Sequence, residues 1–183
     1  MRLIIPLVTV ALAGLATASG GFALGGSALG VGGLSYGGAG QSYGGNGPLG
    51  LFYSFLDPYL RYQEFTWHEA NYLCHSRGMQ LVSLDNYQKD SLVSQLIGYY
   101  GVRWIWTSGQ RSGYQFYWAN GTPVGLYHNN WSYTGSQGIP QPDNAEGNEY
   151  CLAVLNYFYQ DGIVWHDIGC SHRKSFVCEP YYG

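Results

Sequence analysis

The sequence predicts an α+β fold for residues 51–183, built around one hydrophobic core and two disulfide bonds. Helical patterns occur early in this region and most strand patterns occur late, as in folds that segregate helices from strands. The chain has four cysteines and begins with residues expected to be an export signal, which favours disulfides over a metal site. A region of about 130 residues is an ordinary size for one domain.

The first 18 residues are expected to be a signal peptide. Arg2 supplies the positive start, residues 3–15 the apolar stretch, and residues 16–18 a small-residue cleavage site. The apolar stretch is shorter than the roughly 20 residues that cross a bilayer. We therefore expect a secreted, extracellular protein without a membrane span.

Residues 19–50 form a low-complexity tail rich in Gly, Tyr and Ser, which we expect to be disordered. It lacks charged side chains, and it has too few large ones to offset the entropy of ordering. A Ser-Tyr-Gly-Gly repeat occurs at residues 35–38 and 42–45. The tail is either a flexible linker or a segment whose tyrosines adhere to, or are cross-linked within, an extracellular matrix.

The composition limits the class of partner. Charged residues make up 10% of the chain and the formal net charge is -3, with no basic patch to bind nucleic acid. No nucleophile motif is present, so we do not expect an enzyme. The cysteines are Cys74, Cys151, Cys170 and Cys178. Four cysteines allow three pairings, among which these patterns do not choose.

The first part of the domain is expected to contain a strand and a helix. Aromatic and polar residues alternate over residues 59–65, which indicates the strand. Thr66 and Glu69 can then form a capping box at the start of a helix, which Gly78 is placed to end. The apolar face of this helix consists of Trp67, Ala70, Leu73 and Cys74.

A second helix and several strands follow. We expect a strand at residues 81–84, then a helix capped by Asp85 and Gln88. The apolar face of this helix consists of Leu92, Val93, Leu96 and Ile97. Further strands are expected at residues 104–106, 150–155, 163–165 and 176–179, with a turn at Asn120-Gly121. Residues 123–148 show little periodicity, which is typical of a disordered or a functional loop.

Oxygen-bearing side chains gather late in the chain. Gln141 and Asp143 flank Pro142, and Glu149 and Asp167 follow within the same loop-rich region. Carboxylates and amide carbonyls are the ligands that Ca²⁺ prefers. Three carboxylates in one region repel each other unless a cation lies between them. The residues predict a calcium site, with solvated loop charges as the alternative.

These residues together resemble a C-type lectin-like domain of the Gln-Pro-Asp type, over about residues 59–180. The residues that carry the resemblance follow the family's order: Thr66-Trp67, Cys74, Leu81 to Leu84, Trp104-Ile105, Trp118, Asn120-Gly121, Gln141-Pro142-Asp143, Cys151, Trp165, Asp167, Cys170 and Phe176 to Glu179. The resemblance implies a double-loop fold with two helices, antiparallel sheets and a long binding loop. It also implies the disulfides Cys74–Cys178 and Cys151–Cys170.

The resemblance further implies a ligand set. Gln141, Asp143, Glu149 and Asp167 match positions at which sugar-binding members hold Ca²⁺ and contact the sugar. His166 stands where the family has Asn, either to bond a sugar hydroxyl or as a surface histidine. The triplet resembles that of members that prefer galactose-type sugars.

The expected function is therefore that of a secreted, Ca²⁺-dependent lectin that binds glycans, with galactose-type sugars favoured. The alternative is an extracellular matrix or structural protein that uses the lectin-like scaffold for Ca²⁺-independent protein contacts. Asn120 and Asn130 begin N-glycosylation sequons, which matter in an exported chain.

Overall fold

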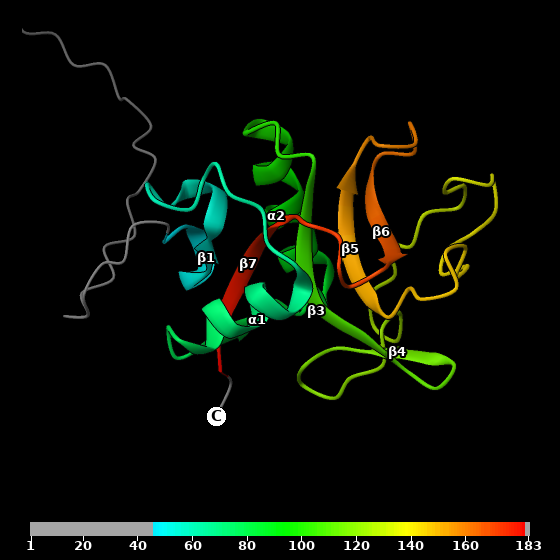
Figure 1. Ribbon diagram of the computed structural model, residues 1–183, viewed down its shortest axis with the longest axis horizontal. Coiled ribbons are helices and arrows are strands. Elements are labelled where there is room, and N and C mark those ends of the chain that lie inside the picture. The colour runs from blue at the N-terminus through cyan, green and yellow to red at the C-terminus, as the bar shows by residue number, and fades with distance from the viewer. Residues whose placement is uncertain (1–45, 182–183) are drawn as a thin grey trace, which may run out of the picture. The chain divides into compact units, whose positions relative to one another are not determined.

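The computed structural model describes residues 46–181, whose helices and strands are labelled in Figure 1. The expected signal peptide and the expected tail as far as residue 45 lie outside the described residues. The last five residues of that tail are described: Asn46 pairs with Phe52, and Pro48–Gly50 form a short 3-10 turn. A second 3-10 turn follows at Ser54–Leu56. No helix within the described part is long and apolar enough to cross a membrane.

The core of the fold is a mixed sheet with the order β1-β7-β3-β5-β6. In addition, β2 pairs with β7 and β4 pairs with β3. The strands are β1 (Phe52–Tyr53), β2 (Met79–Leu81), β3 (Trp104–Ser112), β4 (Gln115–Tyr117), β5 (Cys151–Asn156), β6 (Ile163–Ile168) and β7 (Ser175–Pro180). We expected antiparallel sheets, and all these pairs are antiparallel except β3 with β7, which is parallel.

Each face of the sheet contributes to a separate core cluster, because successive side chains of a strand point to opposite faces. Ile105 of β3 packs in the cluster that includes Val93 and Ile97 of α2 (Tyr87–Tyr99). Its neighbour Trp106 packs in the cluster that includes Trp67 and Ala70 of α1 (Trp67–His75). The sheet thus lies between the two helices (Figure 1).

The predicted helices form, with one correction at a cap. The capping box of α1 is present, since the Thr66 side chain accepts from the Glu69 backbone and the Glu69 side chain accepts from the Thr66 backbone. The residue that caps α2 is Asn86, whose side chain accepts from the Lys89 N–H. The prediction of Asp85 with Gln88 as the cap was wrong, because Asp85 instead forms an ion pair with the Lys89 ammonium at 3.1 Å.

The strand expected at residues 59–65 was wrong. Its aromatic and polar residues alternate, but Asp57 Oδ1 accepts hydrogen bonds from the N–H groups of Tyr59 and Leu60 and turns the backbone. Only Phe65 at the end of this segment pairs with a neighbour, Lys174. Other strands are displaced or longer than predicted: β2 ends at Leu81, where we expected a strand over residues 81–84.

Both disulfides implied by the resemblance are present. Cys74–Cys178 joins α1 to β7, and Cys151–Cys170 joins the start of β5 to the turn after β6. The long segment 123–148 contains no helix or ladder strand, as expected. It is fixed to β6 by backbone hydrogen bonds at Trp165, which accepts from Ser132 N–H and donates to the Asn130 carbonyl.

Candidate cation and carbohydrate site

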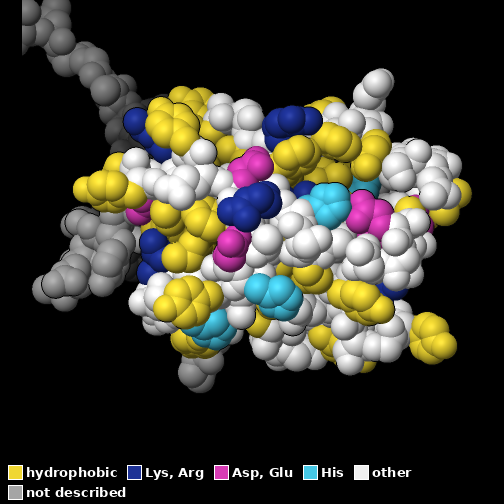
Figure 2. Space-filling view, viewed as in Figure 1, with side chains coloured by type: hydrophobic (Ala, Val, Ile, Leu, Met, Phe, Trp, Pro, Cys, Tyr) yellow, Lys and Arg dark blue, Asp and Glu magenta, His cyan; other side chains and the backbone are white. Residues whose placement is uncertain are grey.

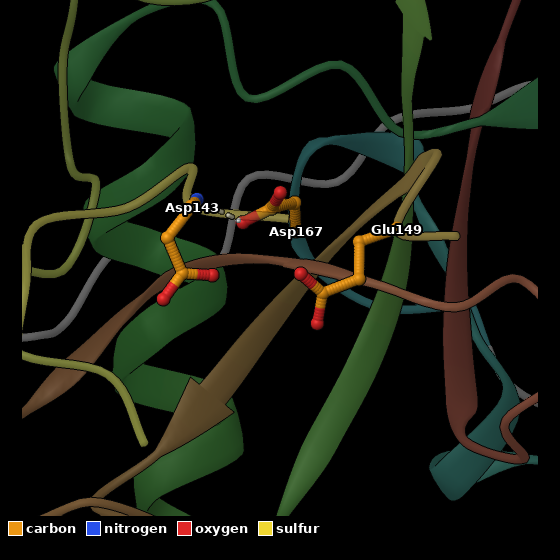
Figure 3. Close-up of side chains that lie close together, drawn as sticks. All are labelled: Asp143, Glu149 and Asp167. Atoms are coloured by element: carbon orange, nitrogen blue, oxygen red, sulfur yellow. Dashed lines mark hydrogen bonds between the residues drawn. The ribbon is translucent and has the colours of Figure 1, made fainter. Parts of the chain in front are cut away.

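The fold brings together the three carboxylates among the predicted metal ligands. Asp143 comes from the long loop, Glu149 lies two residues before Cys151 in β5, and Asp167 lies on β6 opposite Leu152. One carboxylate oxygen of each lies within 4.8 Å of the others. Figure 3 shows the carboxylates of Asp143 and Glu149 turned toward one another, with Asp167 between them.

Asp167 organises the loop around itself. Its Oδ1 accepts from the Asp143 N–H at 3.1 Å and its Oδ2 accepts from the Asn144 N–H at 2.9 Å. Asn144, at φ 52°, in turn accepts the Glu149 N–H on its side-chain oxygen at 3.0 Å. These bonds place the Asp143 and Glu149 side chains beside the end of β6.

Two carboxylate oxygens of the cluster are buried without a hydrogen-bond partner among the described residues. They are Asp143 Oδ2 and Glu149 Oε2. Buried polar atoms are nearly always paired, because an unpaired one costs about 1–3 kcal/mol and an ionised one more. A hard divalent cation satisfies such oxygens, so the donor set fits Ca²⁺.

The electrostatics of the cluster also favour a nearby cation. Burial, followed by the negative charges of Asp167, Asp143 and Glu146, raises the pKa of Glu149 to about 7. Burial likewise raises the pKa of Asp167, opposed by backbone hydrogen bonds and by the Arg111 guanidinium. A nearby cation would stabilise the ionised form of both carboxylates.

Sequence reasoning missed Arg111. It lies on β3, beyond the expected strand end at Trp106, and its guanidinium is 2.7 Å from Asp167 Oδ2. Cys151 of β5 pairs with Gln110 of β3 on one side and with Ile168 of β6 on the other. Arg111, next to Gln110, and Asp167, next to Ile168, therefore come together. No motif marks Arg111; only a longer strand, paired in this register, would have pointed to it. Asp167 therefore already has one positive partner from the protein.

Gln141 and His166 are buried as well. The Gln141–Pro142 bond is cis, and the Gln141 amide lies against Gly135, where an added Cβ would be 2.3 Å from Nε2. His166 is 1% exposed, and its Nε2 lies 3.0 Å from Asp161 Oδ2. Burial lowers the pKa of His166. We expected His166 at the sugar, but in this structure it presents no surface to a ligand.

The two sequons differ in accessibility. Asn120 lies on an exposed turn, with its amide bonded to Asp85. The Asn130 amide is half-buried and donates to both Asp90 Oδ2 and the Ile163 carbonyl. A glycan on Asn130 would replace one of these donor hydrogens, so Asn120 is the more accessible acceptor.

The chain is similar to known proteins of one family. The family model described as Lectin C-type domain matches residues 63–180. The chain is 25% identical over 120 residues to C-type lectin domain family 4 member A of Mus musculus, covering 62% of this chain and 44% of that protein. It is 25% identical over 128 residues to Lectin subunit alpha of Sarcophaga peregrina, covering 64% and 41%. The chain thus spans less than half the length of these two relatives.

Solved structures show the same fold. The C-type lectin domain of murine dendritic cell inhibitory receptor 2, solved in complex with N-glycan, aligns with a TM-score of 0.53 and 19% identity, over 70% of this chain and 87% of that one. Human lithostathine aligns with a TM-score of 0.54 and 18% identity, over 72% and 91%. The family model covers most of the described residues, and the fold is shared. The chain therefore belongs to the C-type lectin domain family.

Proposed function

We propose that this domain is a secreted, calcium-dependent lectin that binds galactose-type glycans. The observation that carries the proposal is the pair of buried, unpartnered oxygens on Asp143 and Glu149 beside Asp167. The glycan-bound relative in the comparisons supports a sugar as the ligand class. The proposed role is binding, without catalysis.

Some residues of the site would bind the ion, and some would also contact the sugar. Asp143, Glu149 and Asp167 would hold the ion, with the Gln141 amide oxygen as a further ligand across the cis bond. A bound Ca²⁺ supplies open coordination positions for two vicinal sugar hydroxyls. Gln141, Asp143 and Glu149 would accept or donate the hydrogen bonds that fix those hydroxyls. The Gln-Pro-Asp order supports galactose-type sugars.

The site predicts a loss of calcium and sugar binding in Asp143→Asn and Glu149→Gln. Each change removes one charge from the ion's partners, and we expect calcium affinity to fall at least about tenfold, or about 1.4 kcal/mol. Both variants should lose retention on a galactose resin. EDTA should release the unaltered protein from the same resin. Calorimetry with CaCl₂ and column retention measure the two effects.

Glu146→Gln is the matched control, because Glu146 is an exposed acid of the same loop that pairs with His172. It should keep calcium and sugar binding nearly unchanged. Sugar retention that persists in EDTA would show that the ion is not part of the site.

A second candidate function is a calcium-independent scaffold in an extracellular matrix. The observation that favours it is the Arg111–Asp167 ion pair, which already neutralises one of the three carboxylates. Large exposed tyrosines, such as Tyr59, Tyr99 and Tyr133, offer contact area for a protein partner. Absence of heat and of a thermal shift with millimolar CaCl₂ would favour the scaffold.

Arg111 is expected to weaken calcium binding. Its guanidinium holds Asp167 Oδ2 and repels a second cation, so Arg111→Gln should raise calcium affinity by about tenfold. Arg111→Lys keeps the charge and should raise affinity much less. Calorimetry of the two variants measures the effect, and equal affinities in both would contradict this role of the charge.

The raised pKa of Glu149 predicts how pH acts on the metal-free protein. Glu149 binds a proton more tightly in the folded state than in the unfolded state, so its ionisation lowers the free energy of unfolding. This loss of stability is absent below about pH 4.5 and grows until the pH exceeds about 7. In EDTA at pH 8, Glu149→Gln should unfold with a free energy about 1–3 kcal/mol higher, since each pKa unit is about 1.4 kcal/mol. Urea titrations at pH 8 and pH 4 test this, and an advantage that persists at pH 4 would contradict it.

A further inference from the structure

A second cleft lies at the other end of β3 from the carboxylate cluster. It encloses about 350 Å³ and is lined by residues that include Arg61, Tyr62, Tyr100, Arg103 and Trp104. Trp104 begins β3 and Arg111 follows seven residues later, which corresponds to roughly 23 Å along a strand. The cleft is therefore separate from the proposed calcium site.

The two arginines of the cleft have no acidic partner among the described residues. Arg61 is held over the Tyr62 ring at 4.6 Å and Arg103 over the Trp104 ring at 4.4 Å. Other described cations are engaged: Arg111 with Asp167, Lys89 with Glu179, and Arg173 with Glu69. Figure 2 shows the Lys and Arg side chains of one face of the domain as separate groups among hydrophobic side chains. Of the three described guanidinium groups that lack an acidic partner, Arg61 and Arg103 thus line this cleft, and the third, Arg77, donates to the Leu73 carbonyl elsewhere.

The cleft also has a net positive surrounding. Lys174 is buried with its ammonium 4.7 Å from the Trp104 ring centre. Burial lowers the pKa of Lys174 to about 8, so most of its population is protonated at pH 7. The acid that lines the cleft, Glu64, accepts a hydrogen bond from Trp104 Nε1 at 2.8 Å, which holds the indole in place. The lining therefore carries two cations, Arg61 and Arg103, and one acid, while Lys174 is not itself a lining residue.

Aromatic rings provide the apolar surface of the cleft. Tyr62 is 85% exposed and Tyr100 is 52% exposed, while Phe55 is buried and packs against the Tyr100 ring at 6.0 Å. Pockets that bind small ligands combine such apolar walls with a few placed polar groups. A pyranose ring has an apolar face of C–H groups that packs on aromatic rings, and guanidinium groups bind carboxylate or sulfate through two parallel hydrogen bonds.

We propose that this cleft binds an acidic saccharide unit, carboxylated or sulfated, independently of calcium. Arg61 and Arg103 contact the acidic group, and Tyr62, Tyr100 and Trp104 pack against the sugar ring. The proposal does not depend on the carboxylate cluster, so either site can fail without the other.

The test uses the full secreted chain in EDTA and a heparin-derived tetrasaccharide as the probe, followed by calorimetry. Arg61→Gln and Arg103→Gln should each weaken binding about tenfold, and Arg103→Lys should weaken it less, because Lys keeps the charge but loses the planar fork. Arg173→Gln removes an exposed charge outside the cleft lining and should change affinity less than about twofold. Asp143→Asn should bind the probe normally. Thermal melting verifies that each variant is folded.

Two further probes identify the acidic group. A hyaluronan tetrasaccharide carries carboxylates as its only acidic groups, so its binding would show that the cleft recognises a carboxylate. If heparin binds and hyaluronan does not, the recognised group is a sulfate. Both results support the proposal. Absence of heparin binding, equal binding of neutral maltotetraose, or an equal loss in Arg173→Gln would overturn it. Equal, arginine-dependent binding of a tetraglutamate peptide would overturn the assignment to a saccharide.

Discussion

Trp165→Ala is expected to lower the free energy of unfolding by about 3–5 kcal/mol, the usual cost of deleting a buried tryptophan. Trp165 is fully buried on β6, and its ring lies within 5.3 Å of the Trp118 and His128 rings. Its Nε1 donates to Asp90 Oδ1 of α2 at 3.0 Å. The side chain therefore joins α2, the long loop and the sheet, and its loss leaves a cavity among all three.

The same change should loosen the loop that carries Asp143. Trp165 pairs with Trp131, and Ser132 of the same segment accepts the Gln141 N–H. Urea unfolding measures the stability loss, and hydrogen exchange at residues 130–145 measures the loosening. Trp165→Phe keeps an aromatic ring in the core but removes the indole donor and part of the ring volume, so it should cost less, about 1–3 kcal/mol. Equal costs for both variants would contradict the packing argument.

Removal of Cys74–Cys178 by a double alanine variant should destabilise the domain more than removal of Cys151–Cys170. The first bond links residues 104 apart and the second links residues 19 apart. In the chain-entropy description these loops contribute about 4.7 and about 3 kcal/mol respectively. Thermal unfolding of the two double variants under oxidising conditions measures the difference.

The order of the two disulfides should be reversed for calcium affinity, on which Cys151–Cys170 should have the larger effect. Cys151–Cys170 connects the start of β5 to the turn after β6, next to Glu149 and Asp167. Its removal should lower calcium affinity in variants that are still folded, whereas removal of Cys74–Cys178 should leave the affinity of the folded fraction unchanged. Calorimetry with CaCl₂ at a temperature below both unfolding transitions separates the two effects, and a reversed order would contradict them.

The elements that the sequence predicts well are those governed by local interactions. The capping box of Thr66 and Glu69 is set within four residues, and α1 begins where that pattern places it. The convergence of Asp143, Glu149 and Asp167 could be predicted because the resemblance supplied the pairing of distant segments. Periodicity alone would have left these residues as separate loop charges.

The features that escaped prediction depend on contacts between distant segments. Arg111 meets Asp167 only because β3 extends to Ser112 and pairs with β5 in a register interrupted between Trp106 and Gln110. His166 is enclosed by its partner Asp161 in the β5–β6 connection, whose conformation no local pattern specifies. The false strand at residues 59–65 shows the converse, because one carboxylate, that of Asp57, overrides an alternating pattern.

The pairing of β1 with β7 has a practical consequence for how the domain is joined to other molecules. Phe52 lies opposite Cys178, so the described chain enters and leaves at neighbouring points on one margin of the sheet, while β6 with Asp167 occupies the opposite margin. Fusion partners or immobilisation tags attached at the two ends of the described residues would lie on the margin away from the carboxylate cluster. Tension applied between the two termini would instead unzip a two-residue ladder first, making that short pairing the weakest link under mechanical load.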